Sequence, residues 1–179
     1  MKKLQKGYVQ IYTGDGKGKT TAALGLAMRA IGDGYKVMMV QFLKGGNTGE
    51  LKSTEFFGEN FVIKRFEKKR DFFWNLKEKE KKELKKEVQE GLDFCFSILR
   101  EDSYDILIMD EVMGALNNKL IEEEQLVNLI AEKPINMEMV LTGRNVPKSI
   151  FDKADLITEM KAIKHYFNDG VLAREGIEY

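Results

Sequence analysis

The sequence predicts an α/β fold in which a mostly parallel sheet carries helices on both faces. Short apolar runs recur along the chain, and those at residues 37–40 and 106–109 are continuously apolar rather than alternating. Such runs are typical of strands that are covered on both faces of a parallel sheet. Helical or glycine-punctuated segments separate most of them, which suits helical connections between parallel strands. The predicted strands are 8–12, 37–42, 61–66, 105–109, 137–141 and 156–160.

Two segments between these runs have the features of helices. Residues 20–31 are rich in Ala, Leu and Met, and Gly32 and Gly34 stand where this helix should end. In the second segment apolar residues recur at intervals of three and four, which predicts an amphipathic helix with a solvated Lys/Glu face. They are Leu84, Val88, Gly91, Leu92, Cys95 and Leu99. The six lysines of residues 77–86 therefore indicate a solvated face rather than a nucleic-acid site.

The composition predicts one soluble domain. At 179 residues and 43% hydrophobic content the chain suits a single domain over residues 1–179, with no visible internal boundary. The 29 positive and 29 negative residues cancel, so charge favours neither nucleic acid nor membrane as a partner. Gln5, Lys6 and Gly7 interrupt the N-terminus before any signal-peptide core develops. Because the single cysteine, Cys95, also excludes an intrachain disulfide, we expect a cytoplasmic location.

A glycine-rich segment after the first predicted strand is typical of a loop that binds nucleotide phosphates. It comprises Gly14, Asp15, Gly16, Lys17, Gly18, Lys19, Thr20 and Thr21. Glycines let successive backbone N–H groups point at phosphate oxygens, and the following helix adds the positive end of its dipole. Lys19 supplies charge for the outer phosphates, and Thr20 a hydroxyl ligand for Mg²⁺. Thr13 replaces the first glycine of the general pattern, so the loop is a variant that still predicts binding of a nucleoside triphosphate.

A second motif ends the strand at 105–109. Asp110 and Glu111 follow it directly, where carboxylates can hold Mg²⁺ beside a phosphate loop, directly or through water. Acidic residues after buried strands also serve as helix caps, so this pair gains its meaning from the loop. Together the motifs predict a P-loop NTPase-like, RecA-like domain with its site at the carboxyl ends of the strands. Mn²⁺ accepts the same hard oxygen ligands as Mg²⁺.

These motifs do not define which bond of the nucleotide breaks. The same phosphate site serves phosphoryl transfer, hydrolysis and reactions at the ribose. A small ATPase or kinase would need a base or a water-orienting residue, which the sequence does not identify. Another alternative is a non-catalytic regulatory module that binds ATP, with the Lys/Glu helix as its docking surface.

The chain also resembles the phosphate-loop ATP:corrinoid adenosyltransferases. The resemblance lies in residues 13–23, 27–32, 40–45, 110–111, 115–116, 141–144, 154–160, 164–165 and 176–179, in the family's order. It implies transfer of the 5′-deoxyadenosyl group of ATP to the Co(I) centre of a reduced corrinoid, with release of triphosphate, in coenzyme B12 synthesis or salvage. Cobalamin, cobinamide and cobyrinic acid diamide all remain open as the corrinoid. The resemblance further implies a homodimer and an electron-donating reductase such as a flavoprotein.

The resemblance assigns roles to particular residues. Co(I) would be the nucleophile, so the protein would position the substrates while Lys17, Lys19 and the loop amides stabilise the leaving triphosphate. Phe72 and Trp74 match a Phe-x-Trp pair that covers the lower face of the corrinoid, excludes the axial ligand and eases reduction of Co(II). Composition alone favours another role, because a cluster such as Phe72-Phe73-Trp74 usually fills a core.

Three further residues lie in the segments that carry the resemblance. Arg29 matches an arginine that reaches the nucleotide, with a surface arginine at the end of the loop helix as the alternative. Arg144 is expected near the nucleotide. His165 is expected to be structural, because a histidine that ligates cobalt stands in Asp-x-His-x-x-Gly and this chain has Ile163 and Asn168 instead.

Overall fold

The computed structural model describes residues 3–179, so residues 1 and 2 of the predicted domain lie outside it. Within the described chain one six-stranded sheet has the order β3-β2-β4-β5-β1-β6, and every neighbouring pair is parallel. The strands are β1 (Val9–Thr13), β2 (Val37–Gln41), β3 (Phe61–Lys64), β4 (Ile106–Asp110), β5 (Glu138–Thr142) and β6 (Leu156–Glu159). Each lies where the sequence predicts it, with small shifts at the ends.

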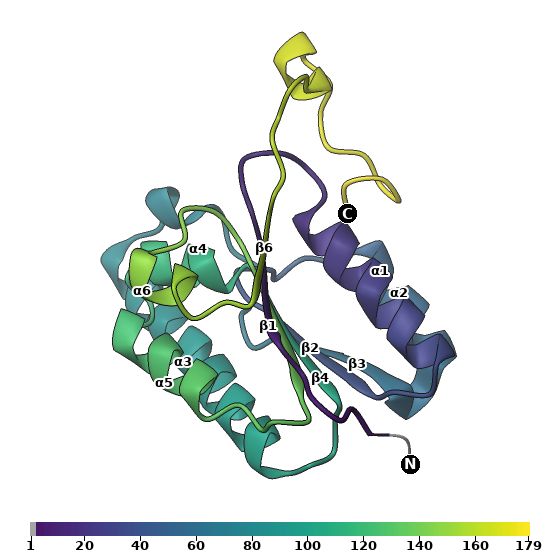
Figure 1. The fold of residues 1–179 in the computed structure, drawn as a ribbon. Helices are drawn as coiled ribbons and strands as arrows, with labels where there is room; N and C mark the ends of the chain where they lie inside the picture. The colour runs from purple at the N-terminus through teal and green to yellow at the C-terminus, as the bar shows by residue number, and fades with distance from the viewer. Residues whose placement is uncertain (1–2) are drawn as a thin grey trace.

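Helices cover both faces of this sheet, as predicted (Figure 1). One face carries α1 (Lys19–Gly32), α2 (Gly49–Thr54) and the 3-10 turn η1 (Glu55–Asn60). The other carries α3 (Glu78–Arg100), α4 (Val112–Asn117), α5 (Glu123–Ala131) and α6 (Lys148–Phe151). Two further 3-10 turns, η2 (Phe73–Asn75) and η3 (Tyr166–Asp169), lie in connecting segments. In the part of the chain that the structure describes, no helix has the length and hydropathy needed to cross a membrane.

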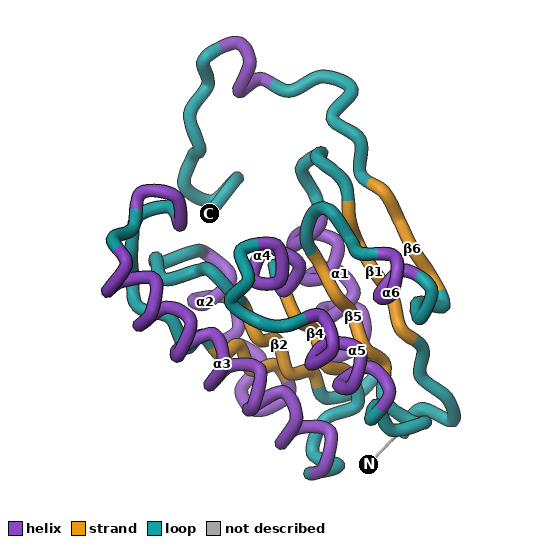
Figure 2. The backbone as a smooth tube through the Cα atoms, turned by 90° about the vertical axis from the view of Figure 1, so that its left-hand side faces the viewer, coloured by secondary structure: helices purple, strands orange, loops and turns teal. Residues whose placement is uncertain are grey.

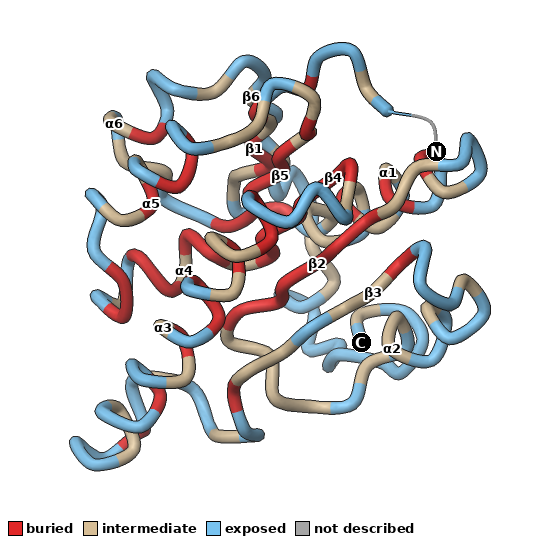
Figure 3. Tube along the Cα trace, turned by 90° about the horizontal axis from the view of Figure 1, so that it is seen from below, coloured by how far each residue is buried: buried red, intermediate tan, exposed pale blue. Residues whose placement is uncertain are grey.

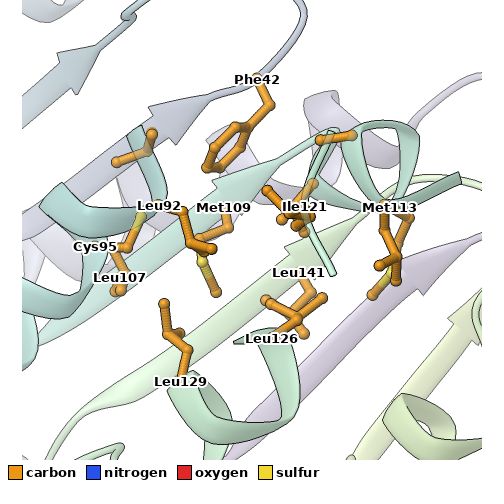
Figure 4. Packing of buried hydrophobic residues seen from close by; sticks show 14 of the residues in the cluster. Phe42, Leu92, Cys95, Leu107, Met109, Met113, Ile121, Leu126, Leu129 and Leu141 are labelled. Atoms are coloured by element: carbon orange, nitrogen blue, oxygen red, sulfur yellow. The ribbon is translucent and has the colours of Figure 1, made fainter. Parts of the chain in front are cut away.

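The larger apolar core lies between the sheet and the α3–α5 layer. Leu92 and Cys95 of α3 and Leu126 of α5 approach Leu107 and Met109 of β4, and all five are fully buried (Figure 4). Cys95 is therefore the core residue that the sequence predicts, and burial raises the pKa of its thiol. A neutral buried thiol is a poor nucleophile, so Cys95 serves packing.

The smaller core explains why the central strands are apolar on both faces. Ala23 and Ala27 of α1 are fully buried against it, and their small side chains let the helix lie close to the strands. Met39 points into this core, whereas its neighbour Met38 points into the larger one. β2 is consequently buried along its whole length (Figure 3).

The strand order brings the two sequence motifs to one edge of the sheet. The phosphate loop follows β1 and Asp110 ends β4, with β5 between the two strands. Parallel strands place their carboxyl ends together, so residues distant in sequence meet there. Residues 161–179 extend beyond this edge, and the C-terminus returns toward the start of α1 (Figures 1 and 2).

Candidate functional site

The glycines of the phosphate loop allow backbone conformations and contacts that other residues disfavour. Gly14 has φ 96° and Gly18, which precedes α1, has φ 124°. The Gly16 N–H donates to the Met160 carbonyl at 2.7 Å, and a Cβ at Gly16 would lie 2.8 Å from that oxygen. The loop therefore curls tightly from β1 into α1 while lying against the end of β6.

Lys19 lies inside this curl. Its Nζ donates to the carbonyl oxygens of Gly14, at 2.6 Å, and Gly16, at 2.9 Å. Burial, and next the charge of Arg144, lowers the pKa of the Lys19 ammonium. The structure thus places Lys19 at the centre of the loop, where the outer phosphates of a nucleotide would need charge.

Asp110 is fully buried and uses both oxygens of its carboxylate. Oδ1 accepts from the hydroxyls of Thr20, at 2.9 Å, and Thr142, at 2.7 Å. Oδ2 accepts from Gln41 Nε2 at 3.1 Å and from Lys44 Nζ at 2.8 Å. The predicted metal-side residues Thr20 and Asp110 are therefore in contact, although 90 positions separate them.

These residues suit a hard divalent cation. A hydroxyl and a carboxylate oxygen lie side by side at the loop, and residues 3–179 gather no group of three or more His, Cys, Asp or Glu that could hold a metal. Mg²⁺ typically takes one or two protein ligands and completes its octahedral shell with water and substrate phosphates. Thr20 and Asp110, which are in contact, are the residues that would hold it, and a role for Glu111 in holding the metal stays a prediction.

Glu111 follows Asp110 and interacts electrostatically with Lys19 and Lys44 of the same site. Its backbone N–H donates to Thr142 Oγ1 at 2.8 Å, and its side chain lines an adjoining cavity. Burial, and next the charge of Asp110, raises the pKa of the Glu111 carboxyl. Glu111 thus stands at the junction of the predicted metal site and the cavity.

The adjoining cavity has a volume of about 400 Å³. Its walls come from the loop after β2, the aromatic segment before α3 and the start of α4. Phe72 and Trp74 line it with side chains that stay largely exposed, at 66% and 73%. Phe73 also lines the cavity, but it is partly buried against the larger core. The aromatic triplet is therefore divided between the core role and the surface role that the sequence left open.

Ion pairs and hydrogen bonds anchor the aromatic segment. The Arg70 guanidinium makes two hydrogen bonds to the Glu87 carboxylate of α3, one of them 2.9 Å from Nη2 to Oε1. Asp71 accepts from the Phe72 N–H at 2.7 Å and from Asn75 Nδ2 at 3.0 Å. These contacts fix the backbone at the base of the exposed rings.

Two residues at the cavity have left-handed backbone conformations that are uncommon outside glycine. Leu43 follows β2 with φ 58°, and Glu111 follows β4 with φ 59°. The Leu43 N–H donates to the buried Glu67 carboxyl at 3.3 Å. Strained conformations of this kind cluster at functional sites, where the surroundings hold them in place. The two residues follow the neighbouring strands β2 and β4, and two such conformations at one cavity support a functional role for it.

The structure treats the two predicted nucleotide-site arginines differently. Arg144 lies at the phosphate loop, where Nη2 donates to the Asp15 carbonyl at 3.3 Å and Nε lies 3.6 Å from Asp15 Oδ1. Arg29 is exposed in the last turn of α1, about 15 Å along the helix axis from Lys19. Contact between Arg29 and the nucleotide therefore stays a prediction, because the structure of this chain does not place Arg29 at the phosphate loop.

Lys17 contacts the C-terminal segment, and its predicted contact with the triphosphate stays a prediction. Its Nζ lies 2.9 Å from Glu178 Oε1 and donates to the hydroxyl of Tyr166 at 3.2 Å. Arg174, Tyr166 and Lys17, in that order, lower the pKa of the Glu178 carboxyl. His165 belongs to the same segment, where its Nδ1 accepts the N–H of Phe167 at 3.1 Å and so caps η3.

The pattern of the ATP:corrinoid adenosyltransferase family BtuR/CobO/CobP matches residues 5–179. The chain belongs to this family. It is 33% identical over 176 residues to the corrinoid adenosyltransferase of Escherichia coli K12, covering 98% of this chain and 87% of that protein. It is 32% identical over 183 residues to corrinoid adenosyltransferase CobA of Salmonella typhimurium, with the same coverage.

Solved structures confirm the fold class of this family member. Flagellar accessory protein FlaH of Methanocaldococcus jannaschii has a TM-score of 0.56 at 13% identity, covering 87% of this chain and 72% of FlaH. A KaiC-like protein of Pyrococcus horikoshii has a TM-score of 0.55 at 15% identity, covering 90% and 75%. Both likenesses concern the fold alone, which is P-loop NTPase-like.

Three side chains that surround Asp110 were not predicted individually as site residues. Gln41 and Lys44 entered only as part of the resemblance, and Thr142 likewise. Each stands at or just after the carboxyl end of a strand whose preceding residues are apolar. Polar residues at those positions are the signal that could have identified them, because ligands bind at that edge of a parallel sheet.

Proposed function

We propose that this protein transfers the 5′-deoxyadenosyl group of ATP to the Co(I) centre of a reduced corrinoid and releases triphosphate, in coenzyme B12 synthesis or salvage. Membership of the adenosyltransferase family over residues 5–179 carries this proposal. The phosphate loop lies next to the cavity that Phe72 and Trp74 line. This arrangement supports the proposal, because the reaction requires two large substrates to meet. Glu111 follows Asp110 and lines the cavity, so it would lie where the two substrates meet.

The proposed chemistry is a displacement at the ribose C5′. The electron pair of Co(I) forms the bond to C5′, and the C5′–oxygen bond breaks with its electrons passing to triphosphate. No protein nucleophile is required, so the chain contributes orientation and charge. The loop amides and Lys19 would hold the triphosphate, with Arg144 at the loop, and Lys17 would join them by exchanging its contact with Glu178 for the phosphates. Mg²⁺ or Mn²⁺, held by Thr20 and Asp110, would supply positive charge for the phosphate oxygens.

Phe72 and Trp74 are the residues that we propose face the corrinoid. Their exposed rings offer an apolar surface at the cavity, and an apolar surface at the lower face of the corrinoid would exclude an axial ligand. Losing that ligand would make Co(II) easier to reduce. We therefore assign this pair to corrinoid activation and the loop to ATP.

We further propose a cytoplasmic homodimer that receives its electron from a reductase such as a flavoprotein. The resemblance to the family supports these partners. Exposed apolar side chains of the C-terminal segment, among them Ile163 and Leu172, support an interface with a second copy. Neither nucleic acid nor membrane is a proposed partner, since the net charge of the sequence is zero.

An anaerobic assay with ATP, Mg²⁺ and chemically reduced Co(I) cobalamin tests the proposal. Adenosylcobalamin should appear with an equal amount of triphosphate. Lys19→Met should lower the rate by about 10²–10³, typical for the loss of one group that stabilises developing charge. The exposed Lys52→Met is the matched control and should keep wild-type activity. Formation of ADP and phosphate with unchanged corrinoid would instead identify an ATPase.

A further inference from the structure

Lys44 stands between the two residues that would hold the divalent cation. Its Nζ lies 2.8 Å from Asp110 Oδ2 and 3.5 Å from Thr20 Oγ1. A third oxygen, Glu50 Oε1, is 3.7 Å away. The Lys44 ammonium therefore has the surroundings expected of a bound cation.

The sheet register and the turn after β2 bring Lys44 to this position. Gln41 pairs with Asp110 across β2 and β4, and the Phe42 N–H then donates to the Asp110 carbonyl at 2.9 Å. Leu43 follows in its left-handed conformation, and the Lys44 side chain then reaches Asp110 with 27% of its surface exposed. The strained turn thus has a consequence, because it aims a lysine at a buried carboxylate.

Asp110 needs a positive partner because its side chain is fully buried. Among residues 3–179 four side chains donate to it, and three of them, Thr20, Thr142 and Gln41, are neutral. A buried carboxylate without a compensating charge is strongly destabilising. Lys19 does not provide this charge at hydrogen-bond distance, since its Nζ contacts loop carbonyls instead.

We propose that Lys44 is the resident counter-ion of the metal position and moves to the triphosphate when the divalent cation binds with ATP. An ammonium and a divalent cation repel strongly at contact distance in a partly buried site. The flexible four-carbon stem of lysine permits a change of partner without movement of the backbone. The displaced ammonium then joins Lys19 in neutralising the leaving triphosphate. This inference rests on the proposed function only in assigning the metal to Thr20 and Asp110.

The proposal predicts opposite effects of one substitution on two binding reactions. Lys44→Met removes the charge and keeps an unbranched side chain. In the absence of nucleotide, Mn²⁺ measured by electron paramagnetic resonance should bind the variant about tenfold more tightly than wild type. The affinity for Mn²⁺–ATP, measured by calorimetry, should fall by about tenfold because the triphosphate loses a cationic partner.

Two other lysine variants separate this role from general effects. Lys52→Met removes the same charge from an exposed position on α2 and should change neither affinity. Lys44→Arg keeps the charge and should retain the weak binding of Mn²⁺ in the absence of nucleotide. Thermal unfolding of all variants establishes that they are folded. If Lys44→Met is not folded, the binding measurements on Lys44→Arg test the proposal.

Unchanged or weaker Mn²⁺ binding by folded Lys44→Met would overturn the proposal, as would unchanged affinity for Mn²⁺–ATP. Tighter Mn²⁺ binding by Lys44→Arg than by wild type would contradict it equally. These readouts are independent of corrinoid turnover. If the predicted affinities are observed but no adenosylated corrinoid forms, the counter-ion role stands and the proposed function fails.

Discussion

Phe72 and Trp74 stack face to face, with ring centroids 4.9 Å apart and planes 2° from parallel. Phe73, which lines the same cavity, also packs against the core, and the Lys81 ammonium lies 5.5 Å from its ring centroid. The short turn η2 thus fastens the segment through one ring and exposes the other two. Because a stacked, exposed pair buries little apolar surface, its role is expected in binding rather than in folding.

The aromatic triplet should therefore separate activity from stability. Phe72→Ala with Trp74→Ala should abolish corrinoid adenosylation, leave the affinity for ATP unchanged and alter the free energy of unfolding by less than about 0.5 kcal/mol. Phe73→Ala should lower the free energy of unfolding by about 1–3 kcal/mol, because that ring is partly buried. Anaerobic turnover, calorimetric ATP binding and urea unfolding of both variants measure these effects. A double variant with normal turnover would remove the pair from the corrinoid site.

The phosphate loop should tolerate no side chain at Gly16. A Cβ there would lie 2.8 Å from the Met160 carbonyl oxygen, so Gly16→Ala must displace the loop from β6. We expect the affinity for ATP to fall by at least about tenfold, equivalent to 1.4 kcal/mol. Gly25→Ala is the matched control, because a Cβ on that face of α1 meets nothing within 4 Å. It should keep ATP affinity and raise stability by about 0.5–1 kcal/mol. Equal ATP affinities of the two variants would contradict the close approach.

The contact between Arg70 and Glu87 should affect the corrinoid more than ATP. Both side chains are largely buried, with 11% and 13% exposed, and Glu87 also accepts the Lys68 N–H at 3.2 Å. Glu87→Gln weakens the charge-assisted bonds at the base of the aromatic segment, at a cost of about 1–2 kcal/mol in stability. The KM for corrinoid should rise several-fold while the KM for ATP stays constant. The exposed Glu90→Gln on α3 should change neither constant. If Glu87→Gln raised the KM for ATP as much as the KM for corrinoid, the contact would not act locally on the aromatic segment.

Glu67 should make stability depend on pH. Burial raises the pKa of its carboxyl above the ordinary value of 4.5, although hydrogen bonds from backbone N–H groups, among them that of Leu43, favour the charged form. The folded state therefore binds this proton more tightly than the unfolded state. The resulting stabilisation is complete below pH 4.5 and is lost as the pH rises through the folded pKa.

Urea unfolding between pH 4 and 8 measures this dependence. The free energy of unfolding of the wild type should fall relative to that of Glu67→Gln as the pH rises, since glutamine does not titrate. Exposed Glu90→Gln should run parallel to the wild type. Parallel curves for Glu67→Gln would show that Glu67 keeps an ordinary pKa.

Local patterns in the sequence were sufficient for the secondary structure and for part of the site. Short apolar runs predicted the six strands, and the intervals between Leu84 and Leu99 predicted the buried face of α3. The glycines and Lys19 predicted the loop, since a phosphate loop is formed by consecutive residues and can be identified from a short stretch of sequence. The contact of Asp110 with Thr20 was also expected, because both follow from the rule for carboxyl ends of parallel strands.

The sequence by itself determined the fold class, the loop and the family, because periodicity, glycine placement and motif order are properties of the chain read in one dimension. Only the tertiary structure decided which side chains share Asp110, since the order of β2, β4 and β5 brings Gln41, Lys44 and Thr142 to it. It also separated Phe73 from its neighbours and turned Lys17 toward Glu178. Contacts between residues distant in sequence depend on the order of the strands and on the path of the C-terminal segment back to the phosphate loop. No local sequence pattern encodes either of these.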